Sequence, residues 1–181
     1  GDLVLNPSWS PDAGKIAFKR KAQVPAGSGP RHLVFHPSGK FFYVVNELIS
    51  SLSSFAYDAA DGVLTLLHTE SSLPAGTTIT SYCSALKASP DGKHLYAGNR
   101  GHNSIARFAI GADRIAKFVD TTSTEGDWPR DFDIDKSGKV LAVGNQQTHD
   151  IRLFRIGADG GITRFGQPIP SGGVTAVAFV N

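Results

Sequence analysis

The sequence predicts an all-β fold built from a repeated four-stranded sheet, and two observations support this. Three segments share one register: PRHLVFHPSGKFFYVVNE from Pro30, CSALKASPDGKHLYAGNR from Cys83 and PRDFDIDKSGKVLAVGNQ from Pro129. In each, a Gly-Lys pair is followed at a fixed distance by an asparagine, and the glycines recur about every 50 residues, a spacing typical of propeller blades. The repeated asparagines are Asn46, Asn99 and Asn145.

Within the first repeat, the residue pattern predicts four short strands. They cover His32–His36, Phe41–Glu47, Ser51–Tyr57 and Val63–His68, and they are rich in β-branched and aromatic residues. No segment shows a sustained helical period with caps. The stretch FFYVVN is apolar on both faces, which indicates a sheet packed between neighbouring sheets. Radially repeated sheets of this kind form a β-propeller.

The same reasoning divides the chain into blades. We expect three complete blades at about 30–70, 83–120 and 129–167, and partial blades at 2–24 and 172–181. In the first partial blade SPDAGK is the turn, and in the last VTAVAFVN aligns with the first strand of a repeat. Because three blades cannot close a ring, we expect the C-terminal half of a larger propeller.

An open propeller predicts a partner for its exposed blade faces. We expect this to be a missing N-terminal half or a second copy of the chain. Closure of the chain on itself as a distorted four-blade ring is the less favoured alternative. The mass of the chain in solution distinguishes these arrangements.

The composition predicts neither a nucleic-acid nor a membrane partner. The chain has 181 residues, 40% of them hydrophobic, and a formal net charge of +2. No apolar run reaches the ~18 residues of a membrane helix. The single cysteine excludes an internal disulfide and allows a reducing compartment, so we expect a cytoplasmic location. No cofactor is predicted.

Arg31 and Glu47 lie at the two ends of the first hairpin. Its Pro-Ser-Gly sequence suits a three-residue loop with glycine in the left-handed position, which would pair His36 with Lys40. Arg31 then faces Val45, and Glu47 lies diagonally on the same face, within reach of a long side chain. A register slip of one residue would put the two charges on opposite faces.

The repeat predicts that several polar residues meet at one end of the channel. Glu47, Arg100 and Gln146 occupy one position, directly after the repeated asparagine, and Arg31 and Arg130 share another. Arginines concentrated there suit a carboxylate or phosphate. The predicted substrate-binding residues are Arg130, Gln146, Asn46 and Asn99.

Other residues with reactive side chains give weaker signals. His32 and His36 would lie about 13 Å apart on a strand, and the usual zinc spacings are absent, so no metal site is predicted. We expect Cys83 to pack in the core rather than act as a nucleophile. Trp128 suits either the channel mouth or packing between blades.

The segments GPRHLVFHPSGKFFYVVNEL, SPDGKHLYAGNRGHNSIARF and PRDFDIDKSGKVLAVGNQ resemble the seven-bladed propeller lactonase family. That family includes bacterial 6-phosphogluconolactonases and fungal carboxymuconate lactonising enzymes. The resemblance covers nearly the whole chain and implies half of a seven-bladed ring. It implies catalytic roles for Arg31, Glu47 and Arg100. It also implies a histidine on a more N-terminal blade, which this chain does not contain.

We therefore predict a lactone hydrolase of the 6-phosphogluconolactonase type, acting on a small anionic sugar lactone. Glu47 would be the general base or acid, and Arg31 or Arg100 would stabilise the oxyanion. The alternatives are a carboxymuconate cyclase, and a propeller that binds or scaffolds without turnover. In the latter, Arg31 and Glu47 form a structural ion pair. We expect little or no activity from the chain alone.

Overall fold

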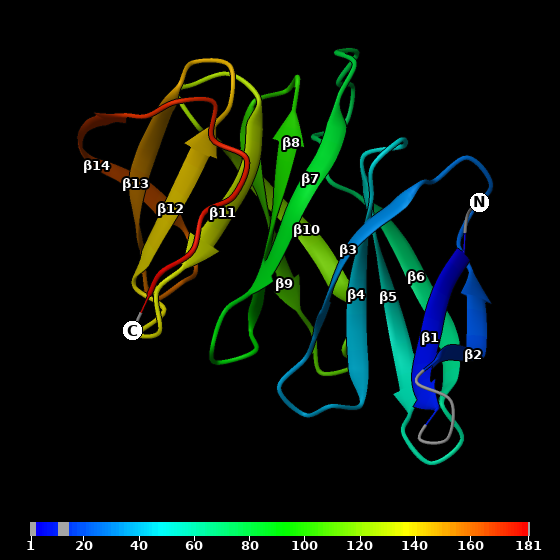
Figure 1. Ribbon diagram of the computed structural model, residues 1–181. Helices are drawn as coiled ribbons and strands as arrows, with labels where there is room; N and C mark the ends of the chain where they lie inside the picture. The colour runs from blue at the N-terminus through cyan, green and yellow to red at the C-terminus, as the bar shows by residue number, and fades with distance from the viewer. Residues whose placement is uncertain (1–2, 11–14, 181) are drawn as a thin grey trace.

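The chain folds into antiparallel sheets that stand side by side (Figure 1). The computed structural model describes residues 3–10 and 15–180. A two-stranded sheet is made by β1 (Leu3–Ser10) and β2 (Lys15–Gln23). The first four-stranded sheet consists of β3 (Pro30–Phe35), β4 (Phe41–Asn46), β5 (Ser51–Asp58) and β6 (Val63–Ser71). The second consists of β7 (Tyr82–Ala88), β8 (His94–Arg100), β9 (Ser104–Ile110) and β10 (Ala116–Ser123). The third consists of β11 (Pro129–Ile134), β12 (Val140–Asn145), β13 (Asp150–Ile156) and β14 (Ile162–Pro170).

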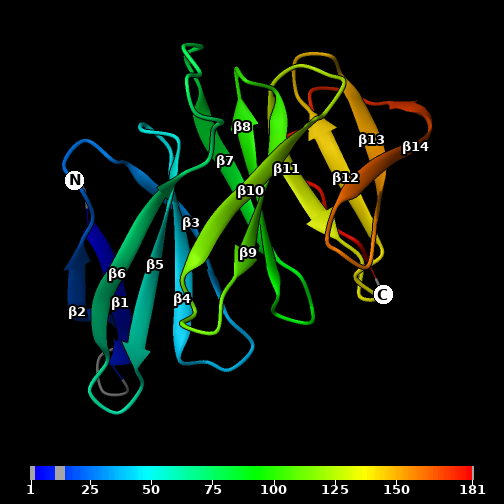
Figure 2. The ribbon, with the colours of Figure 1, turned by 180° about the vertical axis from the view of Figure 1, so that it is seen from behind.

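These three sheets are the three predicted blades, and the expected partial propeller is confirmed. The first strands β3, β7 and β11 lie on the side facing the viewer in Figure 1, and β7 contacts both of the others. The last strands lie on the opposite side, as Figure 2 shows for β6 and β10. In the part of the chain that is described, no helix has the length and apolar character needed to cross a membrane.

The hydrophobic core lies between neighbouring sheets. Between the first and second blades the core joins Tyr43 and Leu52 to Leu86 and Phe108. A second cluster lies between the second and third blades and joins Tyr96 to Phe132. The central strand β4 is buried from its second residue to its last, as expected for a strand covered on both faces.

The repeated turns are one residue longer than the sequence predicted. The His36 amide donates to the Phe41 carbonyl at 2.9 Å, so four residues form the loop and His36 does not pair with Lys40. The Gly39 amide donates to the His36 carbonyl at 2.9 Å, and Gly39 has φ 68°. The predicted left-handed glycine is therefore confirmed, whereas the predicted register at this end of the hairpin is wrong.

A β-bulge offsets this shift before the hairpin ends. Pro30 is opposite Asn46 but His32 is opposite Val45, so Arg31 is an extra residue with no partner in the ladder. Arg130 has the same place in β11, between Pro129 and Asp131. Bulges redirect side chains and are frequent beside functional sites.

The two ends of the chain differ in how closely they match the predicted partial blades. Residues 3–10 and 15–23 form the two expected strands, and β2 contacts β6. Most of the predicted turn, residues 11–14, lies outside the described residues. Residues 172–180 run beside β11 (Figure 1) but form no strand, so the predicted C-terminal strand is wrong. The Val177 and Phe179 amides donate to the side chains of Asp131 and Asp133 instead of to strand carbonyls.

Neighbouring blades are linked by a repeated tyrosine. The Tyr43 hydroxyl donates to the Arg114 carbonyl at 3.0 Å, and the Tyr96 hydroxyl donates to the Gly160 carbonyl at 2.8 Å. Each bond joins the second strand of one blade to the turn before the last strand of the next. Burial raises the pKa of Tyr43 and of Tyr96 to about 12, so both remain protonated donors at neutral pH.

Candidate functional site

The repeated asparagines fix the backbone on which the candidate site stands. Each is fully buried at the end of a second strand. The Asn46 amide donates to Ser51 and Ser53 at 2.9 Å, Asn99 donates to Ser104 at 3.3 Å, and Asn145 donates to Asp150 at 3.0 Å. The side chain thus ties the second strand to the start of the third in every blade. The residue directly after it, at position 47, 100 or 146, is held in an equivalent place.

Glu47 lies between two arginines from different blades. Its Oε2 is 3.7 Å from Arg31 Nε, and its Oε1 accepts a hydrogen bond from Arg100 Nη2. The expected proximity of Arg31 and Glu47 is therefore confirmed. It depends on the bulge at Arg31, which compensates for the longer turn. About a third of the Glu47 side chain, 32%, is exposed, so the carboxylate is accessible.

Arg31 links the first blade to the second. Its Nη1 donates to the Ser84 carbonyl at 2.6 Å and lies 3.0 Å from His32 Nε2. Burial lowers the pKa of the Arg31 guanidinium, and the positive charge of Arg100 lowers it further. Burial and the neighbouring Arg31 also lower the pKa of His32, which favours a neutral ring that accepts from Arg31.

Arg100 is the most enclosed member of the cluster, with 7% of its side chain exposed. Its Nη2 donates to the Cys83 carbonyl at 3.0 Å as well as to Glu47, and its Nε has no acceptor among the described residues. The guanidinium lies 5.5 Å from the centre of the Trp128 ring, a cation–π contact. Arg100 is therefore placed to orient Glu47, while Arg31 and Glu47 offer more surface to a ligand.

The other predicted substrate-binding residues are placed less favourably. Arg130 is half-buried and close enough to Arg31 for its charge to lower the Arg31 pKa. Gln146 is also half-buried, and its backbone amide donates to the Trp128 carbonyl at 3.0 Å. The prediction that Asn46 and Asn99 bind substrate gains no support from this geometry, because both side chains are fully buried.

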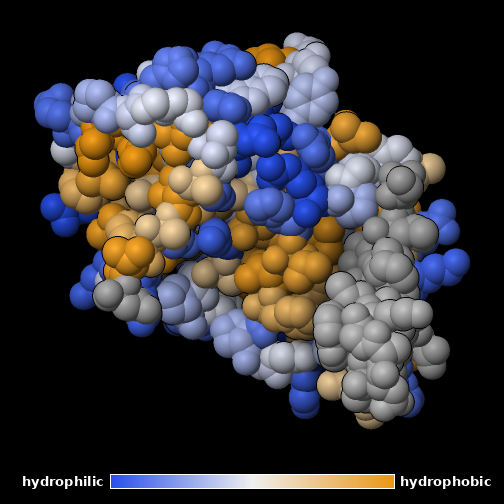
Figure 3. All heavy atoms as spheres, viewed as in Figure 1, coloured by the Kyte–Doolittle hydropathy of each residue, from blue (hydrophilic) through white to orange (hydrophobic). Residues whose placement is uncertain are grey.

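Polar and apolar surfaces meet along the first strands. In Figure 3, hydrophilic side chains gather over the ends of β3 and β7 where these strands begin, and an apolar area lies below them. Leu33 and Phe35 of β3 are 50% and 48% exposed. The charged cluster is thus confined to the end of the inner strands that carries Arg31 and Glu47.

Among the described residues, neither the potential metal ligands nor the thiol of Cys83 form a second candidate site. Within residues 3–10 and 15–180, no three His, Cys, Asp or Glu side chains are grouped so that they could hold a metal ion. Cys83 packs in the core, as predicted, and burial raises its pKa to about 11. A thiol with so high a pKa is a poor nucleophile at neutral pH.

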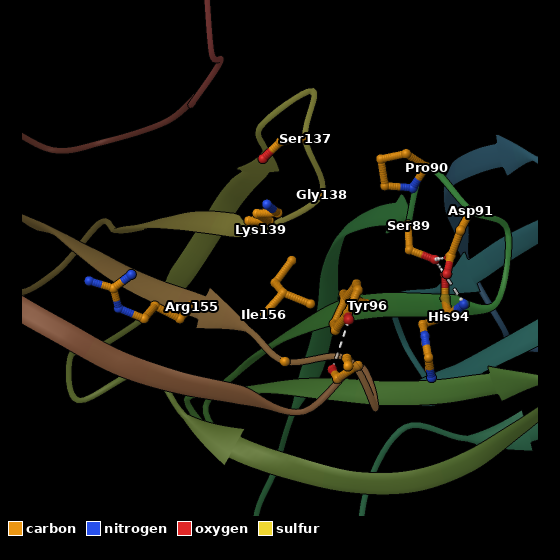
Figure 4. A pocket seen from close by; sticks show the side chains of 13 residues that line it. Ser89, Pro90, Asp91, His94, Tyr96, Ser137, Gly138, Lys139, Arg155 and Ile156 are labelled. Atoms are coloured by element: carbon orange, nitrogen blue, oxygen red, sulfur yellow. Dashed lines mark hydrogen bonds between the residues drawn. The ribbon is translucent and has the colours of Figure 1, made fainter.

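A cavity of about 470 Å³ lies at the opposite, turn end of the second and third blades (Figure 4). Lys139 and Arg155 lie on one side of it, and Asp91 and His94 lie on the other. The Tyr96 hydroxyl at its wall is already bonded to the Gly160 carbonyl. The charges on the two sides differ in sign, so the lining does not select one kind of ion.

The repeat allows this region to be compared with the equivalent place between the first and second blades. At the equivalent place between the first and second blades, the Arg114 side chain reaches His36, with Nη1 3.5 Å from Nε2. Gly160 occupies the Arg114 position in the next blade, and the turn around it has the same backbone hydrogen bonds. Next to Gly160 the corresponding space is taken by His94, whose ring atoms lie 2.6 Å from where a Cβ on Gly160 would stand.

Sequence reasoning missed the role of backbone carbonyls and of Trp128 in the cluster. The Cys83 carbonyl accepts from Arg100, and the Ser84 carbonyl accepts from Arg31. A sequence pattern of side chains cannot predict such backbone acceptors. The stacking of Trp128 on Arg100 had a usable signal, because Trp128, Tyr82 and Gly29 share one repeat position.

Comparison with known proteins gives a consistent result. A family model described as "Lactonase, 7-bladed beta-propeller" matches residues 3–179. The 6-phosphogluconolactonase of Bacillus subtilis (strain 168) is 38% identical over 130 residues, which are 71% of this chain and 37% of that protein. The 6-phosphogluconolactonase of Erwinia tasmaniensis is 34% identical over 151 residues, 82% of this chain and 45% of that protein.

Solved structures show the same likeness. A protein from Lactobacillus plantarum has a TM-score of 0.95 and 35% identity, over 99% of this chain and 53% of that chain. The periplasmic gluconolactonase PpgL of Pseudomonas aeruginosa has a TM-score of 0.88 and 31% identity, over 95% of this chain and 49% of that one. The chain spans about half the length of these relatives or less. On the match across residues 3–179, the chain belongs to the seven-bladed β-propeller lactonase family.

Proposed function

We propose that this chain, completed by the N-terminal blades that its relatives carry, is a lactone hydrolase acting on a small anionic sugar lactone such as 6-phosphogluconolactone. The observation that carries the proposal is the partly exposed Glu47 carboxylate held between Arg31 and Arg100. The substrate class comes from the 6-phosphogluconolactonases of Bacillus subtilis and Erwinia tasmaniensis.

In the proposed reaction, Glu47 takes a proton from a water molecule whose oxygen adds to the lactone carbonyl carbon. Negative charge develops on the carbonyl oxygen, where the Arg31 guanidinium stabilises it. The bond between the carbonyl carbon and the ring oxygen then breaks. Glu47 returns the proton to that ring oxygen, and the product is the open hydroxy acid.

Arg100 and Arg130 have supporting roles in this proposal. Arg100 is nearly buried and orients the Glu47 carboxylate through Nη2. Arg130 is half-buried near Arg31 and binds the anionic group of the substrate, since a guanidinium matches phosphate oxygens in a bidentate fashion. A histidine on a blade outside this chain, implied by the family resemblance, would complete the site.

A brace without catalysis is the second candidate, and the burial of Arg100 favours it. The same Nη2 atom binds both Glu47 and the Cys83 carbonyl, a geometry that suits an ion pair locking two blades together. In this case the propeller would bind or scaffold without turnover. The cyclase alternative shares the residues of the hydrolase and differs in substrate.

The test is hydrolysis of 6-phosphogluconolactone by the full-length protein, measured above the spontaneous rate. We expect Glu47→Gln to lower kcat by about 10²–10⁴-fold. We expect Arg130→Ala to raise KM with little change in kcat, because it removes a contact made equally before and during the reaction. A folded full-length protein with no hydrolysis above the spontaneous rate would leave the brace as the better account. Activity that survives Glu47→Gln would contradict the role of Glu47 as the general base. The 181-residue chain alone is expected to have little activity.

A further inference from the structure

We propose that Trp128, together with Tyr82, forms an aromatic wall of the site that packs against the C–H face of a sugar ring, and that Asn103 is the positioning residue that holds Trp128 there. This inference rests on the proposed function for the identity of the ligand. The wall itself is inferred from the backbone geometry and the contacts of these three residues.

The backbone of Trp128 has a conformation that its side chain makes unfavourable. Trp128 has φ 63°, in the left-handed region, where bulky residues are true outliers. Gly29, at the same repeat position in the first blade, also has φ 63°. The surrounding bonds match too: the Glu47 amide donates to the Gly29 carbonyl as the Gln146 amide donates to that of Trp128. A glycine would therefore suit position 128, and the presence of tryptophan points to a use for its ring.

Asn103 fixes this strained residue from the neighbouring blade. Its Oδ1 accepts the backbone amides of Trp128 at 3.0 Å and Gly101 at 3.1 Å, and its Nδ2 donates to Asp127 at 2.6 Å. The Asn103 carbonyl accepts the amide of Thr124 at 2.9 Å. One side chain thus connects the loop after Arg100 to the loop that carries Trp128.

The ring that is held in this way borders the charged cluster. Its centre lies 5.5 Å from the Arg100 guanidinium and 6.4 Å from the centre of the Tyr82 ring. Both aromatic residues are half-buried, so part of each is accessible to solvent. Arg100 in turn holds Glu47, and the wall therefore continues directly from the proposed catalytic carboxylate.

This arrangement selects a particular class of ligand. A sugar ring has an apolar face made of C–H groups and a polar edge of hydroxyls. The wall offers flat apolar surface for the face, and Arg31 and Glu47 offer partners for the edge. A small anion without a ring can meet the arginines but gains nothing from the wall.

The binding test uses tryptophan fluorescence. The chain has two tryptophans, so Trp9→Phe leaves Trp128 as the only one. In the full-length protein any further tryptophan is also replaced by phenylalanine. We expect glucose 6-phosphate to change the Trp128 emission in a saturable way, and inorganic phosphate at the same concentration to leave it unchanged. The double variant Trp9→Phe, Trp128→Phe is the control that assigns the signal.

Four single substitutions, two at Trp128 and two at Asn103, separate the roles of the ring and of its anchor from effects on the fold. Trp128→Gly keeps the left-handed backbone and removes the wall, and we expect it to raise KM about tenfold with kcat nearly unchanged. Trp128→Phe, which retains an aromatic ring, should recover part of this loss. Asn103 has φ 55°, so Asn103→Gly relieves backbone strain and Asn103→Ala does not. Both variants remove the anchor of Trp128, and we expect both to weaken the response to glucose 6-phosphate.

The outcomes distinguish the wall from the proposed reaction. A folded Trp128→Gly variant with unchanged KM, or a Trp128 emission that glucose 6-phosphate does not alter, overturns the wall and leaves lactone hydrolysis standing. A saturable response without lactonase activity overturns the reaction and supports the wall. Equal responses to glucose 6-phosphate and inorganic phosphate overturn the selection of a ring.

Discussion

At the turn end of the blades, Gly39, Gly92 and Gly138 have φ values of 68°, 70° and 70°, and each donates its backbone amide to the carbonyl three residues before it. At the opposite end, the three positions after the buried asparagines hold a carboxylate, a guanidinium and an amide, at positions 47, 100 and 146. The two ends belong to the same strands. The repeat therefore keeps the backbone constant at both ends, and at the end with the charged cluster it varies the side-chain charge from a carboxylate to a guanidinium to an amide.

The largest difference between the two ends should appear when a carboxylate is neutralised. Glu47→Gln leaves the nearly buried Arg100 without its counter-charge, and we expect the free energy of unfolding to fall by about 3 kcal/mol. At the turn end, Asp91 lies 3.8 Å from Lys93 and both side chains are exposed, so Asp91→Asn should cost below ~1 kcal/mol. Urea unfolding of both variants measures the difference, and equal costs would contradict it.

The buried asparagines should rank next, with unequal effects. Asn99 donates to the Ser72 carbonyl at 2.9 Å, and its Oδ1 accepts the Ser72 hydroxyl at 2.8 Å. Asn99→Ala leaves these groups buried without partners, at a cost of about 2–3 kcal/mol. Asn145→Ala should cost less, because Asn145 Oδ1 has no partner among the described residues. Thermal unfolding of the two variants gives the order, and the reverse order would be inconsistent with these contacts.

The turn glycines allow backbone strain to be separated from close contact. Gly39→Ala adds a Cβ with nothing within 4 Å, so it measures the left-handed conformation alone, at about 1 kcal/mol. Gly92→Ala has the same strain and also brings Cβ to 2.9 Å from His36 Nε2. We expect it to be the more destabilising of the two in urea unfolding. A Gly92→Ala variant as stable as Gly39→Ala would show that His36 moves aside freely.

The smallest expected effect concerns protonation at the charged end. Burial and Arg31 lower the pKa of His32 below its usual 6.5, so neutral His32 favours the folded state. This contribution is complete above pH 6.5 and is lost as the pH falls through the lowered pKa. Arg31→Ala should raise the His32 pKa. An NMR titration of the imidazole tests both statements, and a lower pKa in Arg31→Ala would contradict the assigned cause.

The blades could be predicted from the sequence because turn glycine, asparagine and strand hydrophobicity recur together. The register at the turn could not, because Pro37-Ser38-Gly39 suits loops of either three or four residues, and only the bond from the His36 amide to Phe41 decides between them. The tail resembles a first strand in composition. Its amides nevertheless bond to Asp131 and Asp133, a contact between segments that local pattern does not encode.

The sequence was sufficient to predict which charged residues of the candidate site lie together. The repeat brought Arg31, Glu47 and Arg100 together, and the structure pairs them. The detailed geometry depends on backbone groups. A bulge directs the Arg31 side chain, and backbone carbonyls accept hydrogen bonds from Arg31 and Arg100. The Trp128 amide donates to the Asn103 side chain. Such interactions require knowledge of which backbone groups lie nearby, and the spacing of side chains along the sequence does not supply it.

The bulges at Arg31 and Arg130 have a consequence for how this protein can evolve. A residue with no partner in the ladder can be exchanged without disturbing the alternation of side chains along its strand. Duplication of a blade therefore copies the strand ladder together with one position whose side chain lies outside the ladder pattern. Single substitutions there can change the charge at the inner end of a blade, while the original blade keeps its strand pairing.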